Sequence, residues 1–178
     1  MSSFVEIYNT ISALGSILMA LLAISIIVAV LIDRKSMFVQ FIAKHSLKLG
    51  FIFSIVGVIG SLIYSNVIGY PPCMFCWYAR IFLYPQMFLY GLALYHKDEL
   101  VYRYTKILTI LGIIFGTYHY ITEMIGSAPI PCSAGGVSCL TRYVFLFGFV
   151  SIPFMVLSIF VLLASILFAK ARVIHTTN

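Results

Sequence analysis

The stretch from residue 50 to residue 80 decides the fold; it reads GFIFSIVGVIGSLIYSNVIG, then YPP, then CMFCWYAR. Its first part, Gly50 to Gly69, carries no charged residue and is long enough to cross about 30 Å of hydrocarbon as a helix. Cys73 and Cys76 follow, and the next apolar run begins at once. A Cys-x-x-Cys pair at a membrane surface is typical of a redox couple or of half a metal site.

The composition of the whole chain agrees with a membrane protein. Hydrophobic residues make up 62% of the chain and charged residues only 9%, whereas soluble domains carry about a quarter charged residues. Such a chain cannot cover a water-facing surface, and a helical bundle satisfies its backbone inside lipid. The net charge of +6 does not indicate a nucleic-acid partner, because Lys and Arg fall in short gaps between apolar runs.

Apolar runs long enough to span a membrane occur five times. They cover Ile7 to Ile32, Gly50 to Gly69, Cys76 or Trp77 to Tyr95, Ile107 to Ile125, and Tyr143 to Ala169. No Lys or Arg precedes the first run and no small-residue cleavage site follows it, so we expect a retained helix and not a signal peptide. The predicted fold is an all-α integral membrane protein, with a four-helix transmembrane bundle and one additional N-terminal transmembrane helix.

The basic residues predict the orientation of these five spans. Most of the eleven Lys and Arg residues lie in the gaps after the first and third runs and in the tail after the fifth: Arg34, Lys35, Lys44, Lys48, Lys97, Arg103, Lys106, Lys170 and Arg172. Five crossings put these three segments on one side, which the positive-inside rule makes cytoplasmic. Both cysteine pairs then face outward, where thiols are not held reduced.

The first cysteine pair is expected at the start of a helix. Tyr70-Pro71-Pro72 holds the chain extended, so Cys76 falls in the first helical turn, where free N–H groups and the helix dipole favour a thiolate. Arg80 lies four residues on, on the same helix face. It could stabilise that thiolate or a reduced electron acceptor, or it could be an interfacial arginine that snorkels to the headgroups.

The second pair, Cys132 and Cys139, lies on a loop with a flexible Gly135-Gly136 step. A disulfide that closes so short a loop adds little stability, which suggests a labile bond. Two such pairs within reach of each other suggest a relay by thiol–disulfide exchange. A zinc site of four thiolates is an alternative, although the spacing of the second pair does not fit a zinc knuckle. An inert structural disulfide explains the second pair well but the first pair poorly.

Polar residues in the apolar runs mark further candidates. His119 near the outer end of its run could hydrogen-bond a quinone carbonyl or carry its proton, or belong to an interfacial belt. Glu123, four residues further along, is expected to belong to this interfacial belt. Gln86 is expected to make a hydrogen bond in helix packing.

The motif Pro72-Cys73-Met-Phe-Cys76-Trp77-Tyr78-Ala-Arg80 resembles the active segment of the disulfide bond formation protein B (DsbB) family. Tyr118-His119-Tyr120, Pro131-Cys132 with Val137-Ser-Cys139, and Phe147-Gly148-Phe149-Val-Ser-Ile-Pro153-Phe154 resemble its BdbC-like branch. The resemblance runs from about residue 49 to residue 169. It divides the chain into residues 1–48, an additional N-terminal transmembrane helix and cytoplasmic loop, and residues 49–178, a DsbB-like four-helix redox domain.

The resemblance implies a quinone-dependent protein-disulfide oxidoreductase in the bacterial cytoplasmic (inner) membrane. Its partner would be an extracytoplasmic thioredoxin-fold thiol oxidase of the DsbA or BdbD kind, which attacks Cys132. Electrons would pass from Cys132 and Cys139 to Cys73 and Cys76, with Cys139 attacking Cys73, and then to ubiquinone or menaquinone. Arg80, His119 and Trp77 would hold the quinone, with no metal.

Two other classes of protein stay open on the residues alone. One is a membrane thiol reductase that runs the same relay outward, because spacing does not reveal the potentials of the two disulfides. The other is a non-enzymatic membrane protein that binds a metal through thiolates.

Overall fold

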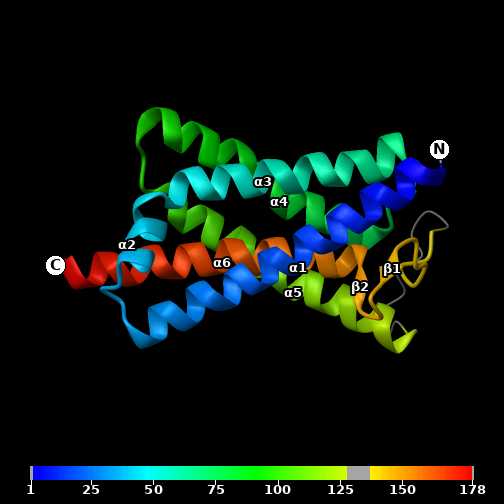
Figure 1. Cartoon of the computed structure of the whole chain (residues 1–178). Helices are drawn as coiled ribbons and strands as arrows, with labels where there is room; N and C mark the ends of the chain where they lie inside the picture. The colour runs from blue at the N-terminus through cyan, green and yellow to red at the C-terminus, as the bar shows by residue number, and fades with distance from the viewer. Residues whose placement is uncertain (1, 128–136, 178) are drawn as a thin grey trace.

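The computed structural model describes residues 2–127 and 137–177. Its helices are α1 (Ser2–Ile32), α2 (Met37–Lys44), α3 (Ser46–Leu62), α4 (Met74–His96), α5 (Val101–Ile125) and α6 (Ile152–Thr177), with a π-helical turn, η1 (Ile63–Val67), that continues α3. Two short strands, β1 (Phe145–Leu146) and β2 (Val150–Ser151), precede α6. The long helices lie side by side and the two termini lie at opposite ends of the bundle (Figure 1).

Within the described residues, four helices are long and apolar enough to cross a membrane: Ser3–Ile32, Ser46–Val67, Val101–Ile125 and Ile152–Val173. The predicted class, an all-α membrane bundle with an N-terminal spanning helix, is therefore confirmed. The fifth expected span is α4, which has 23 residues but is more polar, with Arg80 and Gln86 in its length. Its crossing stays a prediction.

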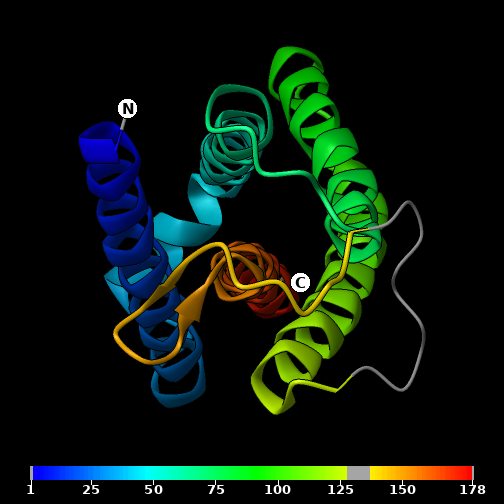
Figure 2. The same ribbon diagram turned by 90° about the vertical axis from the view of Figure 1, so that its right-hand side faces the viewer.

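Helix α6 forms the centre of the bundle, with α1, α3, α4 and α5 around it (Figure 2). Phe160, Leu162, Leu163 and Ile166 on α6 are at most 1% exposed. Large side chains on the outside of the helices show the opposite pattern, as with Leu18 at 67% exposed. Burial of polar backbone inside and exposure of apolar side chains outside is the arrangement that lipid requires.

Close packing in the bundle depends on glycines that face large side chains. A Cβ at Gly112 of α5 would lie 2.3 Å from the Phe160 ring, and one at Gly50 of α3 would lie 2.7 Å from the Tyr90 ring. Gln86 and Thr109 add a polar contact, since the Thr109 hydroxyl donates to Gln86 Oε1 at 3.0 Å. This confirms the helix-packing role expected for Gln86.

Residues 37–44 form α2, where the sequence had predicted a cytoplasmic loop. Ser36 caps the helix, because its hydroxyl accepts from the Val39 N–H at 3.3 Å. Val39 and Ile42, three residues apart, are 0% and 5% exposed and pack into a cluster with α1 and α6. The basic residues nearby mask this short amphipathic pattern, so the sequence did not predict a helix within the connection.

The last helix begins at Ile152 and not at Tyr143 as predicted. Residues 145–151 form a hairpin in which Phe145 pairs with Ser151 and Leu146 with Val150. The turn uses positive φ at Phe147 (55°) and Gly148 (79°). Pro153 then falls in the first turn of α6, where its missing N–H costs nothing. The prediction began the helix too early because an apolar hairpin and the first turns of an apolar helix have the same hydropathy.

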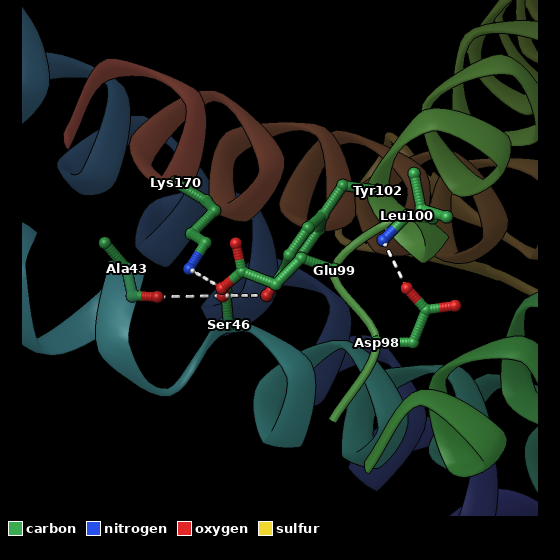
Figure 3. A network of polar contacts seen from close by, with 7 residues as sticks. All are labelled: Ala43, Ser46, Asp98, Glu99, Leu100, Tyr102 and Lys170. Atoms are coloured by element: carbon green, nitrogen blue, oxygen red, sulfur yellow. Dashed lines mark hydrogen bonds and ion pairs between the residues drawn. The ribbon is translucent and has the colours of Figure 1, made fainter. Parts of the chain in front are cut away.

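Polar contacts join the helices at the end of the bundle that holds α2 and the α4–α5 turn (Figure 3). Ser46 Oγ and Tyr102 Oη lie 2.6 Å apart, which links α3 to α5. Lys170 of α6 bonds to Glu99 at 2.7 Å. The Leu100 N–H donates to Asp98 Oδ1 at 2.8 Å. We call this the basic end, and the end with Cys73, Cys76 and Cys139 the cysteine end.

Candidate active site

The Cys73–Cys76 pair lies where α4 begins. Cys73 is the N-cap residue, with extended backbone (φ −73°, ψ 174°), and its carbonyl accepts from the Trp77 N–H at 3.2 Å. Met74 starts the helix, so Cys76 falls within the first turn, as the two prolines predict. The two sulfur atoms lie 3.1 Å apart. They are in contact, within about 1 Å of the length of a disulfide bond.

His119 of α5 reaches the same pair from across the bundle. Its Nε2 lies 3.7 Å from the sulfur of Cys73, and both residues are buried. The ring of Phe75 lies 5.4 Å from the His119 ring and holds it in place on one side. A base in contact with one member of a dithiol can take part in its proton transfers.

The reduced pair shares its proton unequally. The pKa of Cys73 is raised to about 12, first because of its hydrogen bond with the Cys76 sulfur and second because it is buried. His119 works in the other direction, but the net effect is upward. Cys73 therefore keeps its proton, and the negative charge of the reduced pair falls on Cys76 near the dipole of α4.

Cys139 packs against the first pair. It is 2% exposed and belongs to one buried cluster with Cys73 and Phe75, with Cys76 and Val137 at its edge. The structure therefore brings one member of the second pair to the first. Cys132, the other member, lies outside the described residues.

Arg80 is bonded to the neighbouring helix. Its Nε donates to the Ser61 hydroxyl at 2.9 Å and an Nη donates to the Ser61 carbonyl at 3.2 Å. Its guanidinium also lies 5.1 Å from the Trp77 ring centre. Ser61 lies two residues before the π-helical turn η1, and such turns are frequent at functional sites. Sequence reasoning missed Ser61, whose only signal was a hydroxyl in an apolar run.

A cavity of about 460 Å³ opens beside the cysteine pair. It is mostly apolar and is lined by Cys73, Cys76, Arg80, His119 and Cys139, with walls from α1, α3, α4 and α6. Trp77 does not line it and is 54% exposed. The predicted site residues within the described ranges thus gather at one cavity, except Trp77, which reaches it only through Arg80.

Two further polar groups line this cavity. Glu123 is 3% exposed, and its Oε2 has no hydrogen-bond partner among the described residues. The Tyr84 hydroxyl is also buried and unbonded within residues 2–127 and 137–177. Glu123 was expected in an interfacial belt; its burial contradicts that expectation, and both Arg142 and the hairpin, whose Phe149 carbonyl accepts from the Tyr120 hydroxyl at 3.0 Å, contact this end of α5. Arg142 donates to the Glu123 carbonyl at 2.6 Å.

The pair and His119 could also hold a metal ion. The ligand atoms of Cys73, Cys76 and His119 all lie within 4.8 Å of one another. Two thiolates and an imidazole suit a tetrahedral metal such as zinc, with one position left to fill.

These features define a class of protein: a helical membrane bundle with a buried dithiol, a further cysteine beside it and an apolar cavity at one end. The family model described as "Disulfide bond formation protein DsbB" matches residues 43–170. The chain belongs to this family.

Individual relatives agree with the family match. A probable disulfide formation protein of Oceanobacillus iheyensis is 39% identical over 140 residues, which are 73% of this chain and 94% of that protein. Disulfide bond formation protein C of Bacillus subtilis is 33% identical over 63% of this chain and 82% of its own length. A probable disulfide formation protein of Coxiella burnetii is 35% identical over 65% of this chain and 80% of its own length. No solved structure gives a significant match.

Proposed function

We propose that this protein is a membrane thiol:quinone oxidoreductase that supports disulfide bond formation. It would reoxidise an extracytoplasmic thioredoxin-fold thiol oxidase and pass the electrons to a membrane quinone. The observation that carries the proposal is the contact of Cys73 and Cys76 at a cavity against which Cys139 also packs. Family membership supports the same chemistry.

The thiol steps balance as two exchanges. A thiolate of the reduced partner attacks Cys132 of the Cys132–Cys139 disulfide, which forms a mixed disulfide and releases Cys139 as a thiolate. The second thiol of the partner then attacks the mixed disulfide, so that Cys132 is released and the partner departs oxidised. Cys139 next attacks Cys73 of the Cys73–Cys76 disulfide, and Cys76 leaves as a thiolate. Cys132 resolves the Cys73–Cys139 bond. The second pair is again a disulfide, and two electrons now reside on Cys73 and Cys76.

The surroundings of the first pair suit these steps. Cys139 and Cys73 share one buried cluster, so attack needs no long movement. The high pKa of Cys73, about 12, keeps the proton there and makes Cys76 the leaving thiolate, which faces the cavity that Arg80 also lines. Arg80 would stabilise negative charge in that cavity, and His119 would move a proton to or from Cys73.

The cavity fits an aromatic, lipid-soluble acceptor. Its lining is mostly apolar, and the Tyr84 hydroxyl and Arg80 give it hydrogen-bond donors. A quinone bound there, ubiquinone or menaquinone, would supply an acceptor for two electrons and two protons. Arg80, Tyr84 and His119 would hold it, with Trp77 acting through its contact with Arg80.

The location we propose is the bacterial cytoplasmic membrane, with the cysteine end outward. The basic end carries Lys35, Lys44, Lys97 and Lys170, and a concentration of Lys and Arg favours the cytoplasmic side. The cysteine end then lies where an oxidised thiol is maintained.

Turnover of the purified protein tests this proposal. With a ubiquinone or menaquinone analogue, it should oxidise a reduced thioredoxin-fold thiol oxidase, and Cys132→Ser should abolish the mixed disulfide with that partner. Cys76→Ser should abolish quinone reduction. A Cys76→Ser variant that reduces quinone at the parental rate would show that the electron path is wrong.

A thiolate metal site is a second candidate, favoured by the convergence of Cys73, Cys76 and His119 within 4.8 Å. Elemental analysis of the protein purified without chelator separates the two. Stoichiometric zinc that disappears in His119→Ala would favour the metal site, whereas a metal-free protein that turns over thiols would favour the oxidoreductase.

A further inference from the structure

One face of α1 forms a wall of the cavity beside the cysteine pair. Tyr8, Ser12, Gly15, Ser16 and Met19 all line it; apart from the adjacent Gly15 and Ser16, they are three or four residues apart, as on one face of a helix. The family match begins at residue 43, so this wall comes from outside the matched range.

The cavity reaches the outside of the bundle between α1 and α3. Ile11 of α1 and Val56 and Ile59 of α3 line the cavity and are also 62%, 45% and 51% exposed. Side chains that are both exposed and cavity-lining mark a mouth. Because all three lie within apolar spanning helices, this mouth opens toward lipid and not toward water.

A row of tyrosine rings lines the cavity. The rings of Tyr8 and Tyr64 lie 5.1 Å apart, those of Tyr64 and Tyr70 6.1 Å, and those of Tyr70 and Tyr143 4.7 Å. All four residues line the cavity. The Tyr8 hydroxyl also reaches the Gly60 carbonyl at 3.5 Å, which ties α1 to α3 above the mouth. This row of rings links α1, η1 and the segments that precede α4 and β1 along the cavity.

We propose that α1 is part of the acceptor site, and that the gap between α1 and α3 is the lateral entrance by which a lipid-soluble quinone reaches Cys76 from the bilayer. The inference rests on the proposed function. It assigns Gly15 as the residue that keeps the cavity open, because a Cβ built there meets nothing within 4 Å. A larger side chain at this position would occupy space without displacing a neighbouring helix.

Quinone binding in the Cys76→Ser background tests the proposal, since no electron transfer then accompanies binding. The chain has a single tryptophan, Trp77, one residue from the pair, so quenching of its fluorescence by a short-chain quinone analogue gives an apparent Kd. Gly15→Phe should raise that Kd about tenfold or more, because extra atoms in an occupied site cost free energy as overpacking does. Leu14→Phe, on the exposed side of α1 at 54%, is the matched control and should leave Kd unchanged.

Photolabelling gives a second readout that needs no α1 variant. An azidoquinone analogue irradiated with the Cys76→Ser protein should label the peptide that contains residues 8–19. An unchanged Kd in Gly15→Phe, or a label confined to residues 43–170, would overturn the role of α1 and leave the proposed function standing. If the Cys76→Ser parent binds no quinone at all, the proposed function and this inference fall together.

Discussion

The sulfur of Cys73 lies 3.7 Å from Nε2 of His119, although the two residues are 46 positions apart in the chain. The contact joins the start of α4 to the last turns of α5, at the point where Cys139 also packs. Cys73 thus has a base beside it, whereas no such contact is seen for Cys76 among the described residues, and both cysteines line the cavity that Arg80 also lines. The asymmetry suits a pair that receives electrons on one side and releases them on the other.

Loss of His119 should make Cys73 harder to ionise. In a Cys76→Ser background, we expect His119→Phe to move the pH midpoint of Cys73 alkylation up by about one unit, since a hydrogen bond to a charged group is worth about that much. His119 favours the thiolate, so its removal shifts the midpoint upward. His119→Gln, which keeps a donor, should stay near the parent. If the Cys76→Ser parent, His119→Phe and His119→Gln all show the same midpoint, His119 takes no part in the proton transfers of Cys73.

The reduced pair should react at Cys76 and not at Cys73. With Cys132 and Cys139 replaced by serine, iodoacetamide at pH 8 should modify Cys76 first, because a thiol with a pKa of about 12 is roughly one part in ten thousand thiolate at that pH. Peptide mass spectrometry identifies the modified residue. Cys73 should become reactive only as the pH rises toward its pKa. Equal modification of both cysteines at pH 8 would contradict the assigned protonation.

Ser61 should position Arg80 for the acceptor. Ser61→Ala removes the 2.9 Å bond from Arg80 Nε, and a hydrogen bond to a charged group is worth about 1.5–3 kcal/mol. We expect the KM for a quinone analogue to rise about tenfold, with the rate of partner oxidation at saturating quinone little changed. Ser25→Ala, an exposed serine bonded within α1, is the control. A KM equal to that of the parent would mean that Arg80 holds its place without Ser61.

A methyl group at Gly112 should destabilise the close packing of α5 against α6. Gly112→Ala would place a Cβ 2.3 Å from the Phe160 ring, and such overpacking costs about 1–3 kcal/mol. The Tm in detergent should fall by several degrees. At Gly116, a Cβ would meet Leu157 at an ordinary 3.6 Å, so Gly116→Ala should keep the Tm or raise it slightly. A fall of the same size in both variants would point to backbone effects and not to the Phe160 contact.

The sequence alone predicted the features that depend on apolar length and local chemistry. A helix through residues 50–62 and a cysteine pair at the start of α4 follow from hydropathy and from Pro71 and Pro72. Gln86, polar in the middle of a helix, had to find a partner and found Thr109. Such inferences need only the residue and its neighbours along the chain.

What the sequence could not predict depends on which helices meet. Ser61 as the partner of Arg80 follows from the packing of α3 against α4, and Glu123 as a buried cavity residue follows from the contact of Arg142 with α5. The hairpin at residues 145–151 was missed because an apolar sequence fits a hairpin as well as a helix. Helix α2 was missed because the basic residues around it conceal its short amphipathic pattern. The wall that α1 gives the cavity is likewise a result of tertiary packing.

Transfer of electrons between the two cysteine pairs requires Cys139 to form a bond with Cys73. A protein with Cys76→Ser and Cys132→Ser keeps only these two thiols, both in one buried cluster. Under mild oxidation, peptide mapping without reductant should find the Cys73–Cys139 disulfide as the main product within one chain. If Cys73 and Cys139 remain separate thiols while the fold is intact, the relay proposed for this protein is contradicted.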